Sequence, residues 1–344
     1  MIRSVLNLLR RSGRPTPAVG QTPADVVHRE NKWTLLRYRM RPEGLAYRTP
    51  VLLVPSLINR HYVLDLMPGK SFVEHMVAQG HDVYIIDWGT PTDEDRYVDF
   101  DEICDRTIGR ALRVATRTSG QPRAHLLGYC LGGTLTTIHA AVHPQRVASL
   151  LALAAPIRFA DDGLLSRWTR TKSFDVDALV EGTGNVPWPL MQAAFHMLRP
   201  TLTLSKVAGL LDRAWDDEFL DGFLAIERWG NDNVSFPGEA YRRYIQALYR
   251  DDELAAGTMT LAGRPVRLED IERPVLTIAF THDHIVPCDS AAVLDQWVGS
   301  EDHECWTLPG GHVGAVVSRK AASGLWPRIS QWWAEREVGA EPLE

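Results

Sequence analysis

The sequence lacks the features that mark several large classes of protein. It has four cysteines in 344 residues, too few for a disulfide scaffold, so we expect reduced thiols and a cytoplasmic location. Its longest apolar run, residues 147–157, is too short to span a bilayer. Positive charge is not in excess either: 37 Lys and Arg against 43 Asp and Glu give a net charge of −6. That balance offers no electrostatic basis for binding nucleic acid.

Internal repeats and low-complexity tracts are also missing, and what remains is the composition of a folded globular protein. Hydrophobic residues make up 45% of the chain and charged residues 23%, which excludes a disordered chain. The first fourteen residues are basic and weakly amphipathic, without the long apolar core or cleavage site of a signal peptide. They are open to two interpretations, a frayed terminus or a short helix that docks on a surface or partner.

Strand-like and helix-like patterns alternate along most of the chain. The strand-like segments are continuously apolar, which is typical of parallel strands covered on both faces. In the first half they are residues 33–39, 50–59, 81–89, 123–130 and 149–157. Amphipathic helical patterns separate them, as in residues 71–80 and 100–120. The sequence therefore predicts an α/β fold with a mainly parallel sheet.

The alternation is interrupted once, which divides the chain into three predicted parts. Residues 158–263 are mostly helical in pattern, and strand patterns return at 274–283 and 304–312. We expect an irregular N-terminal arm (1–31), a core formed by residues 32–157 and 264–338, and an inserted helical cap (158–263). Ligands of open α/β sheets bind at the carboxyl ends of the strands, so the cap should lie there.

The strongest local signal is the hexapeptide Gly128-Tyr129-Cys130-Leu131-Gly132-Gly133, between a strand pattern and a helix pattern. Small residues two before and two after a nucleophile allow the sharp strand–turn–helix elbow that exposes it. The positive end of the following helix favours a thiolate. Glycine-rich turns also bind phosphate, but neither phosphate-binding fingerprint is present. A Cys at this turn can also be an inert buried side chain. The choice between the two depends on whether a catalytic acid and base occur later in the chain.

Two such partners follow Cys130 in the expected order. Asp283 ends the strand pattern 274–283. His312 ends the strand pattern 304–312, where Gly311 precedes it and Gly314 follows two residues later. Taken alone, Asp283 can be a helix cap or a surface carboxylate, and His312 can be a histidine whose hydrogen bonds are satisfied within a loop. Together with the elbow, their order nucleophile–acid–base matches the catalytic triad of the α/β-hydrolase fold, which the sequence therefore predicts.

Backbone groups complete the predicted site. The N–H of Leu131 should face the pocket as one oxyanion donor, and the segment 55–60 should supply a second from Leu57 or Ile58. His282, Asp283, His284 and Cys288 carry zinc-ligand side chains, but their spacing matches no usual structural zinc pattern. We therefore expect no metal.

A cysteine at the elbow indicates thioester chemistry. Attack of a thiolate on an acyl thioester exchanges one thioester for another of similar energy, which keeps the acyl group activated. If a hydroxyl then accepts the acyl group, the enzyme is an acyltransferase; if water accepts it, the enzyme is a thioesterase. The residues alone leave this choice open.

Four motifs, in order over about residues 32–333, and one further segment resemble those of the polyhydroxyalkanoate (PHA) synthases. GYCLGG at the elbow is similar to that family's Gly-x-Cys-x-Gly-Gly motif. The stretch LINRHYVLDLMPGKSFVEHMVAQGHDVYIIDWG, the THDHIVP segment and PGGHVGAVVS resemble its other conserved segments, as does RWGNDNVSFPGEAYRRYIQALY behind the cap. The length and short arm are similar to class III catalytic subunits, although Leu131 replaces the Gln common in that class.

The resemblance implies roles for particular residues. Cys130 would accept the acyl group and His312 would act as the general base. Asp283 would activate the substrate 3-hydroxyl, whereas the triad interpretation has it orient His312, and both remain open here. His284 matches a second family histidine of uncertain role. Trp229 matches a tryptophan linked to the dimer interface, with a buried cap aromatic as the alternative.

The resemblance also implies substrates and partners. It predicts transfer of (R)-3-hydroxyacyl groups from CoA to a growing polyester through a cysteine thioester, with no metal or redox cofactor. A homodimer, a class III partner subunit and a place at the polyester granule surface are expected. The alternatives are a cysteine α/β-hydrolase (thioesterase or polyester depolymerase) and a non-catalytic granule scaffold.

Overall fold

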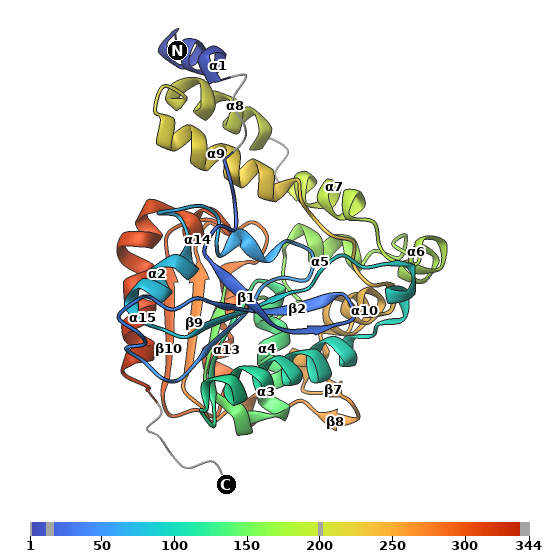
Figure 1. Cartoon of the computed structure of the whole chain (residues 1–344). Coiled ribbons are helices and arrows are strands. Elements are labelled where there is room, and N and C mark those ends of the chain that lie inside the picture. The colour runs from blue at the N-terminus through green and yellow to red at the C-terminus, as the bar shows by residue number, and fades with distance from the viewer. Residues whose placement is uncertain (1, 12–16, 199–201, 338–344) are drawn as a thin grey trace.

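The computed structural model describes residues 2–11, 17–198 and 202–337, and a single large sheet lies at its centre (Figure 1). The eight strands lie in the order β1-β2-β4-β3-β5-β6-β9-β10. All neighbouring pairs are parallel except β1–β2 and β2–β4. The strands are β1 Ala24–Glu30, β2 Trp33–Tyr38, β3 Val51–Val54, β4 Val83–Asp87, β5 Ala124–Tyr129, β6 Val147–Leu153, β9 Val275–Phe280 and β10 His303–Leu308.

Helices cover both faces of this sheet, as the continuously apolar strand patterns predict. Every residue of β3, β5, β6 and β9 is buried. Along β3, Val51 and Leu53 pack on one side with α2 and α15, while Leu52 and Val54 pack on the other with α3 and α4. These helices are α2 Phe72–Gln79, α3 Ile108–Ser119, α4 Leu131–Val142 and α15 Trp326–Ala334; a π-helical turn, Glu102–Thr107, precedes α3. The predicted parallel α/β architecture is confirmed.

The prediction of an irregular arm over residues 1–31 is wrong for much of that segment. Residues 2–11 form α1 (Ile2–Arg11), and residues 24–30 form the edge strand β1. Asn7 of α1 donates 2.8 Å hydrogen bonds to the Ala214 carbonyl and to Asp217, and Arg11 pairs with Asp221. A distant part of the same chain thus supplies the partners of α1, which no local pattern shows. Residues 1, 12–16, 199–201 and 338 of the predicted parts lie outside the described residues.

The segment predicted as a helical cap consists of two differently placed parts. Helices α8 and α9 project from the sheet together with α1, whereas α10 lies close to the core (Figure 1). Phe236, Ile245 and Leu248 belong to the same buried cluster as β3 and α4. The boundary at 263 falls inside a small hairpin of β7 and β8. The elements are α5 Leu164–Thr169, α6 Val176–Thr183, α7 Trp188–Leu198, α8 Leu202–Arg213, α9 Asp217–Gly230, α10 Gly238–Arg243, the π-helix Tyr244–Arg250, α11 Glu253–Ala256, β7 Thr260–Leu261 and β8 Arg264–Pro265.

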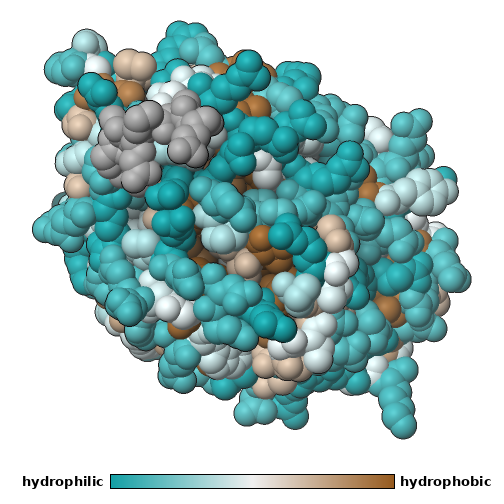
Figure 2. Space-filling model, turned by 90° about the horizontal axis from the view of Figure 1, so that it is seen from below, coloured by the Kyte–Doolittle hydropathy of each residue, from teal (hydrophilic) through white to brown (hydrophobic). Residues whose placement is uncertain are grey.

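The face opposite the α1–α8–α9 projection is mainly hydrophilic, and a hollow near its middle shows hydrophobic residues at its base (Figure 2). Several large exposed apolar side chains occur on α1, α7 and α8 and just after α8, including Leu6, Met197, Val207 and Trp215. Among the residues that the structure describes, no helix has the length and apolar character needed to cross a membrane.

Candidate active site

Cys130 stands at a strained turn between β5 and α4. Its φ of 55° and ψ of −130° lie in a region that side-chain-bearing residues rarely adopt. The glycines of the hexapeptide permit this turn. A Cβ on Gly128 would lie 2.3 Å from Thr136 Oγ1, and one on Gly133 would lie 2.3 Å from the Ala155 Cβ. The sequence of the elbow therefore dictates its close packing, and the strained residue is the one with the nucleophilic side chain.

The loops after β9 and β10 bring Asp283 and His312 to this turn. His312 Nδ1 lies 2.6 Å from Asp283 Oδ2, and the Cys130 side chain is near enough to raise the pKa of the imidazole. The other carboxylate oxygen, Oδ1, accepts the backbone N–H groups of Ile285 and Val286 at 2.8 and 2.9 Å. The structure thus brings together the three side chains predicted from sequence, with the carboxylate held at both oxygens.

The electrostatics of this group favour a proton on the imidazole. Burial lowers the pKa of His312, but Cys130 and the Asp283 carboxylate outweigh burial and raise that pKa to about 10. The His312 residue is 8% exposed, and the Asp283 side chain is 1% exposed. A proton taken from the Cys130 thiol would therefore stay on His312, in a site with little water to compete for it.

Tyr129 also supports the site, and the sequence reasoning missed it. Its ring stacks on the His312 ring with centroids 5.3 Å apart, and its hydroxyl donates a 3.3 Å hydrogen bond to the His312 carbonyl. Tyr244 and Tyr249, from the π-helix Tyr244–Arg250, lie edge to face with ring centroids 5.3 Å apart, and burial raises the pKa of both hydroxyls. Tyr129 occupies the variable position of the elbow motif, so only its place directly before the nucleophile could have signalled a role.

We expect Tyr129→Leu to slow acylation of Cys130 roughly tenfold or more, because the imidazole loses both its stacking partner and the anchor on its backbone. Tyr129→Phe keeps the ring and should cost less than Tyr129→Leu. Single-turnover release of CoA measures the step. Equal rates in wild type and Tyr129→Leu would show that the ring does not position His312.

The predicted oxyanion donors lie on either side of the elbow. Leu131 is the first residue of α4, so its N–H has no acceptor within the helix. The loop after β3 closely approaches the elbow: a Cβ on Gly132 would lie 2.1 Å from the carbonyl oxygen of Val54, at the end of β3. Within the part of the chain that is described, the N–H groups of Leu57 and Ile58 donate no hydrogen bond. Donors are thus available in both predicted segments.

The two remaining predicted residues lie differently from the triad. His284 is exposed and forms no hydrogen bond with any described residue, so nothing draws it into the site. Trp229 is 8% exposed and donates a 3.0 Å hydrogen bond from its indole N–H to the Arg60 carbonyl. Its indole therefore packs within this chain, against the end of the predicted oxyanion segment 55–60.

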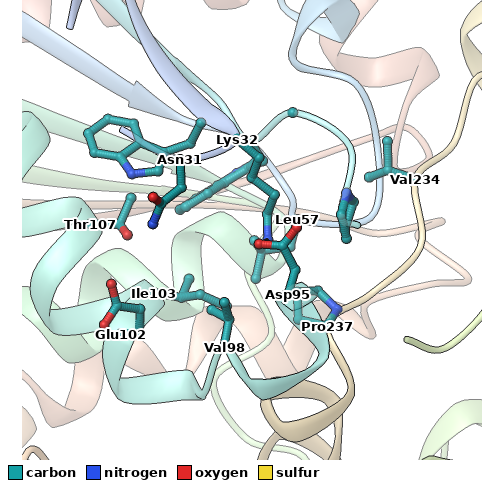
Figure 3. Close-up of a pocket in the computed structure, with 14 residues that line it drawn as sticks. Asn31, Lys32, Leu57, Asp95, Val98, Glu102, Ile103, Thr107, Val234 and Pro237 are labelled. Atoms are coloured by element: carbon teal, nitrogen blue, oxygen red, sulfur yellow. The ribbon is translucent and has the colours of Figure 1, made fainter. Parts of the chain in front are cut away.

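A small cavity of about 40 Å³ borders the loop after β3 at Leu57 (Figure 3). Leu57 and Val234 line it, together with the ion pair of Lys32 and Asp95, whose charged atoms are 3.0 Å apart. A space of this size holds a few water molecules and is far too small for an acyl-CoA. The cavity leaves Leu57 incompletely packed on one side.

Comparison with known sequences identifies the family of the chain. Residues 49–315 match the model of the α/β hydrolase fold family, and residues 16–76 match that of the N-terminus of poly-beta-hydroxybutyrate polymerase. The chain is 36% identical to a poly(3-hydroxyalkanoate) polymerase subunit of Allochromatium vinosum, over 92% of this chain and 90% of the relative. A subunit of the same name from Haloferax mediterranei is also 36% identical, over 94% of this chain and 66% of the relative.

Solved structures agree with the fold. A soluble variant of the monoglyceride lipase from Saccharomyces cerevisiae superposes with a TM-score of 0.58 at 14% identity, covering 94% of this chain and all of that one. With the α/β hydrolase family model, this confirms the predicted α/β-hydrolase fold. The resemblance seen in the four motifs is confirmed as well: the chain belongs to the family of poly(3-hydroxyalkanoate) polymerase subunits, which are acyltransferases.

Proposed function

We propose that this polymerase transfers (R)-3-hydroxyacyl groups from CoA to a growing polyester through a thioester on Cys130. The observation that carries the proposal is the elbow cysteine beside an imidazole that a buried carboxylate holds. A thiol is suited to this substrate because it exchanges with the CoA thioester at nearly equal energy.

In the first half-reaction His312 takes the proton of the Cys130 thiol, and the thiolate attacks the carbonyl carbon of the acyl-CoA. The N–H of Leu131 and an N–H of Leu57 or Ile58 stabilise the negative oxygen that forms. The carbon–sulfur bond to CoA then breaks, and the CoA sulfur takes the proton from His312. The products are free CoA and an acyl thioester on Cys130.

In the second half-reaction the 3-hydroxyl of another hydroxyacyl group attacks this thioester. His312 accepts the hydroxyl proton and returns it to the sulfur of Cys130, so an ester bond forms and the thiol is restored. We assign Asp283 the task of orienting the imidazole, because both of its oxygens already accept hydrogen bonds within the chain. The route needs neither a metal nor a redox cofactor, since thiol, imidazole and backbone N–H groups supply the nucleophile, base and charge stabilisation.

The proposal includes a place in the cell and partners. We place the enzyme in the cytoplasm at the surface of its polyester product, and the exposed apolar side chains of α1, α7 and α8 support contact with such a surface. A homodimer and a partner subunit of the class III kind remain predictions from the resemblance.

The test is an assay of (R)-3-hydroxybutyryl-CoA with the purified chain, alone and with a class III partner subunit. Release of CoA and formation of polymer are measured together. We expect CoA release to be matched by ester bonds in polymer. Release matched instead by free hydroxyacid would identify a thioesterase and overturn the proposal.

A further inference from the structure

Five hydrogen bonds join the loop after β3 to one short segment at the end of α9. The loop is residues 57–62, which we call the oxyanion loop; the segment is residues 229–234, which we call the latch. Val234 N–H donates to the Ile58 carbonyl at 3.2 Å, and Trp229 Nε1 donates to the Arg60 carbonyl at 3.0 Å. The Asn59 side-chain amide donates to Oδ1 of Asn233, and the same two residues pair in an isolated antiparallel bridge.

Asp232 supplies the other two contacts of the latch. Its two carboxylate oxygens accept Arg60 Nε at 3.1 Å and the Tyr62 hydroxyl at 2.7 Å. The side chains of Asp232 and Arg60 are 46% and 25% exposed. Ion pairs this exposed add little to global stability, so the contact matters mainly for where it places the loop.

The loop depends on these bonds because packing does not hold it on every side. Leu57 and Val234 both border the small cavity, which Figure 3 shows between the two segments and the helical turns below them. Side chains beside a void lose contacts that would otherwise fix their backbone. The latch occupies the carbonyls of Ile58 and Arg60, while the N–H groups of Leu57 and Ile58 donate no bond in the described part of the chain.

We infer that the latch is a positioning element of the polymerase, holding the oxyanion loop so that its free N–H groups meet the charge that develops during acyl transfer. Trp229 and Asp232 act through the loop and touch neither substrate nor Cys130. An error of about 1 Å in such donors costs up to roughly 100-fold in rate. The inference rests on the proposed function, since it requires a thioester carbonyl attacked by Cys130.

Two reactions of the same sulfur separate a positioning role from a structural one. Acylation by (R)-3-hydroxybutyryl-CoA passes through an oxyanion, whereas alkylation by iodoacetamide displaces iodide at a saturated carbon and forms none. The variants are Asp232→Ala, at the exposed contact, and Trp229→Phe, which removes the indole N–H. We expect single-turnover acylation to fall at least about tenfold in both variants. Alkylation of Cys130, followed by peptide mass spectrometry, should stay within about twofold of wild type.

The matched control is Trp332→Phe, which removes another buried indole N–H, bonded to Glu304 on β10. We expect it to leave both rates near those of wild type. Equal losses of acylation and alkylation in the latch variants, or no loss of either, would overturn the inference. Cys130→Ala is assayed in parallel: CoA release by that variant would contradict the proposed chemistry, whereas the latch is judged on the ratio of the two rates.

Discussion

Cys130→Ala should abolish turnover while leaving the fold intact. The substitution removes the only atom proposed to carry the acyl group, and His312 and the backbone donors cannot replace it. Loss of a nucleophile typically costs roughly 10⁴-fold or more. Cys130→Ser should also lose most activity, because a hydroxyl gives up its proton far less readily than a thiol. Release of CoA from (R)-3-hydroxybutyryl-CoA is the measurement.

Cys130→Gly is the control that separates chemistry from folding. A φ of 55° with a ψ of −130° is costly for any residue with a Cβ but not for glycine. Cys130→Gly should therefore be as inactive as Cys130→Ala and more stable than it by about 1 kcal/mol in urea unfolding. Appreciable polymer formation by either variant would show that Cys130 is not the acyl carrier.

Gly132→Ala should destabilise the protein by about 3 kcal/mol or prevent folding. The added Cβ would lie 2.1 Å from the Val54 carbonyl oxygen and 2.7 Å from that of Pro55. Both atoms belong to the backbone at the end of a buried central strand, so neither can move without shifting the oxyanion loop that follows. Activity should fall with stability. The free energy of unfolding in urea, together with CoA release, measures both effects.

Gly182→Ala provides the comparison for this effect. Gly182 lies in α6, and a Cβ there would meet nothing within 4 Å. Alanine is the better helix former, so this variant should be unchanged or more stable by up to about 1 kcal/mol. If the two alanine variants unfold at the same urea concentration, the close packing of the elbow does not limit stability.

The parts of the fold and site that could be predicted are those encoded by neighbouring residues or by order along the chain. Largely apolar runs identify β3 and β5, because burial on both faces leaves few positions for polar side chains; His125 in β5 is one of the few. The elbow at Cys130 could be found because its glycines have a steric role in a local turn. Asp283 and His312 could then be predicted as the acid and base, because parallel strands bring their carboxyl ends to one edge of the sheet.

The parts that could not be predicted depend on contacts between distant segments. The bond from Trp229 to Arg60 joins positions 169 residues apart, and nothing near either residue indicates the other. Helix α1 is too short to be assigned without its partner on α9. The π-helical turns at Glu102–Thr107 and Tyr244–Arg250 depart from the 3.6-residue period on which helix prediction relies. The stacking of Tyr129 on His312 requires the loop after β10 to be placed first.

The docking of α1 on α9 also has a consequence for the order in which the chain folds during synthesis. Asn7 finds its partner Asp217 only 210 residues later in the chain. At about 5 to 20 residues per second, a ribosome needs roughly 10 to 40 s to make that stretch. For that interval the side chains of Asn7 and Arg11 lack the partners that they have in the folded chain. A segment made before the entire sheet is therefore among the last to reach its final place.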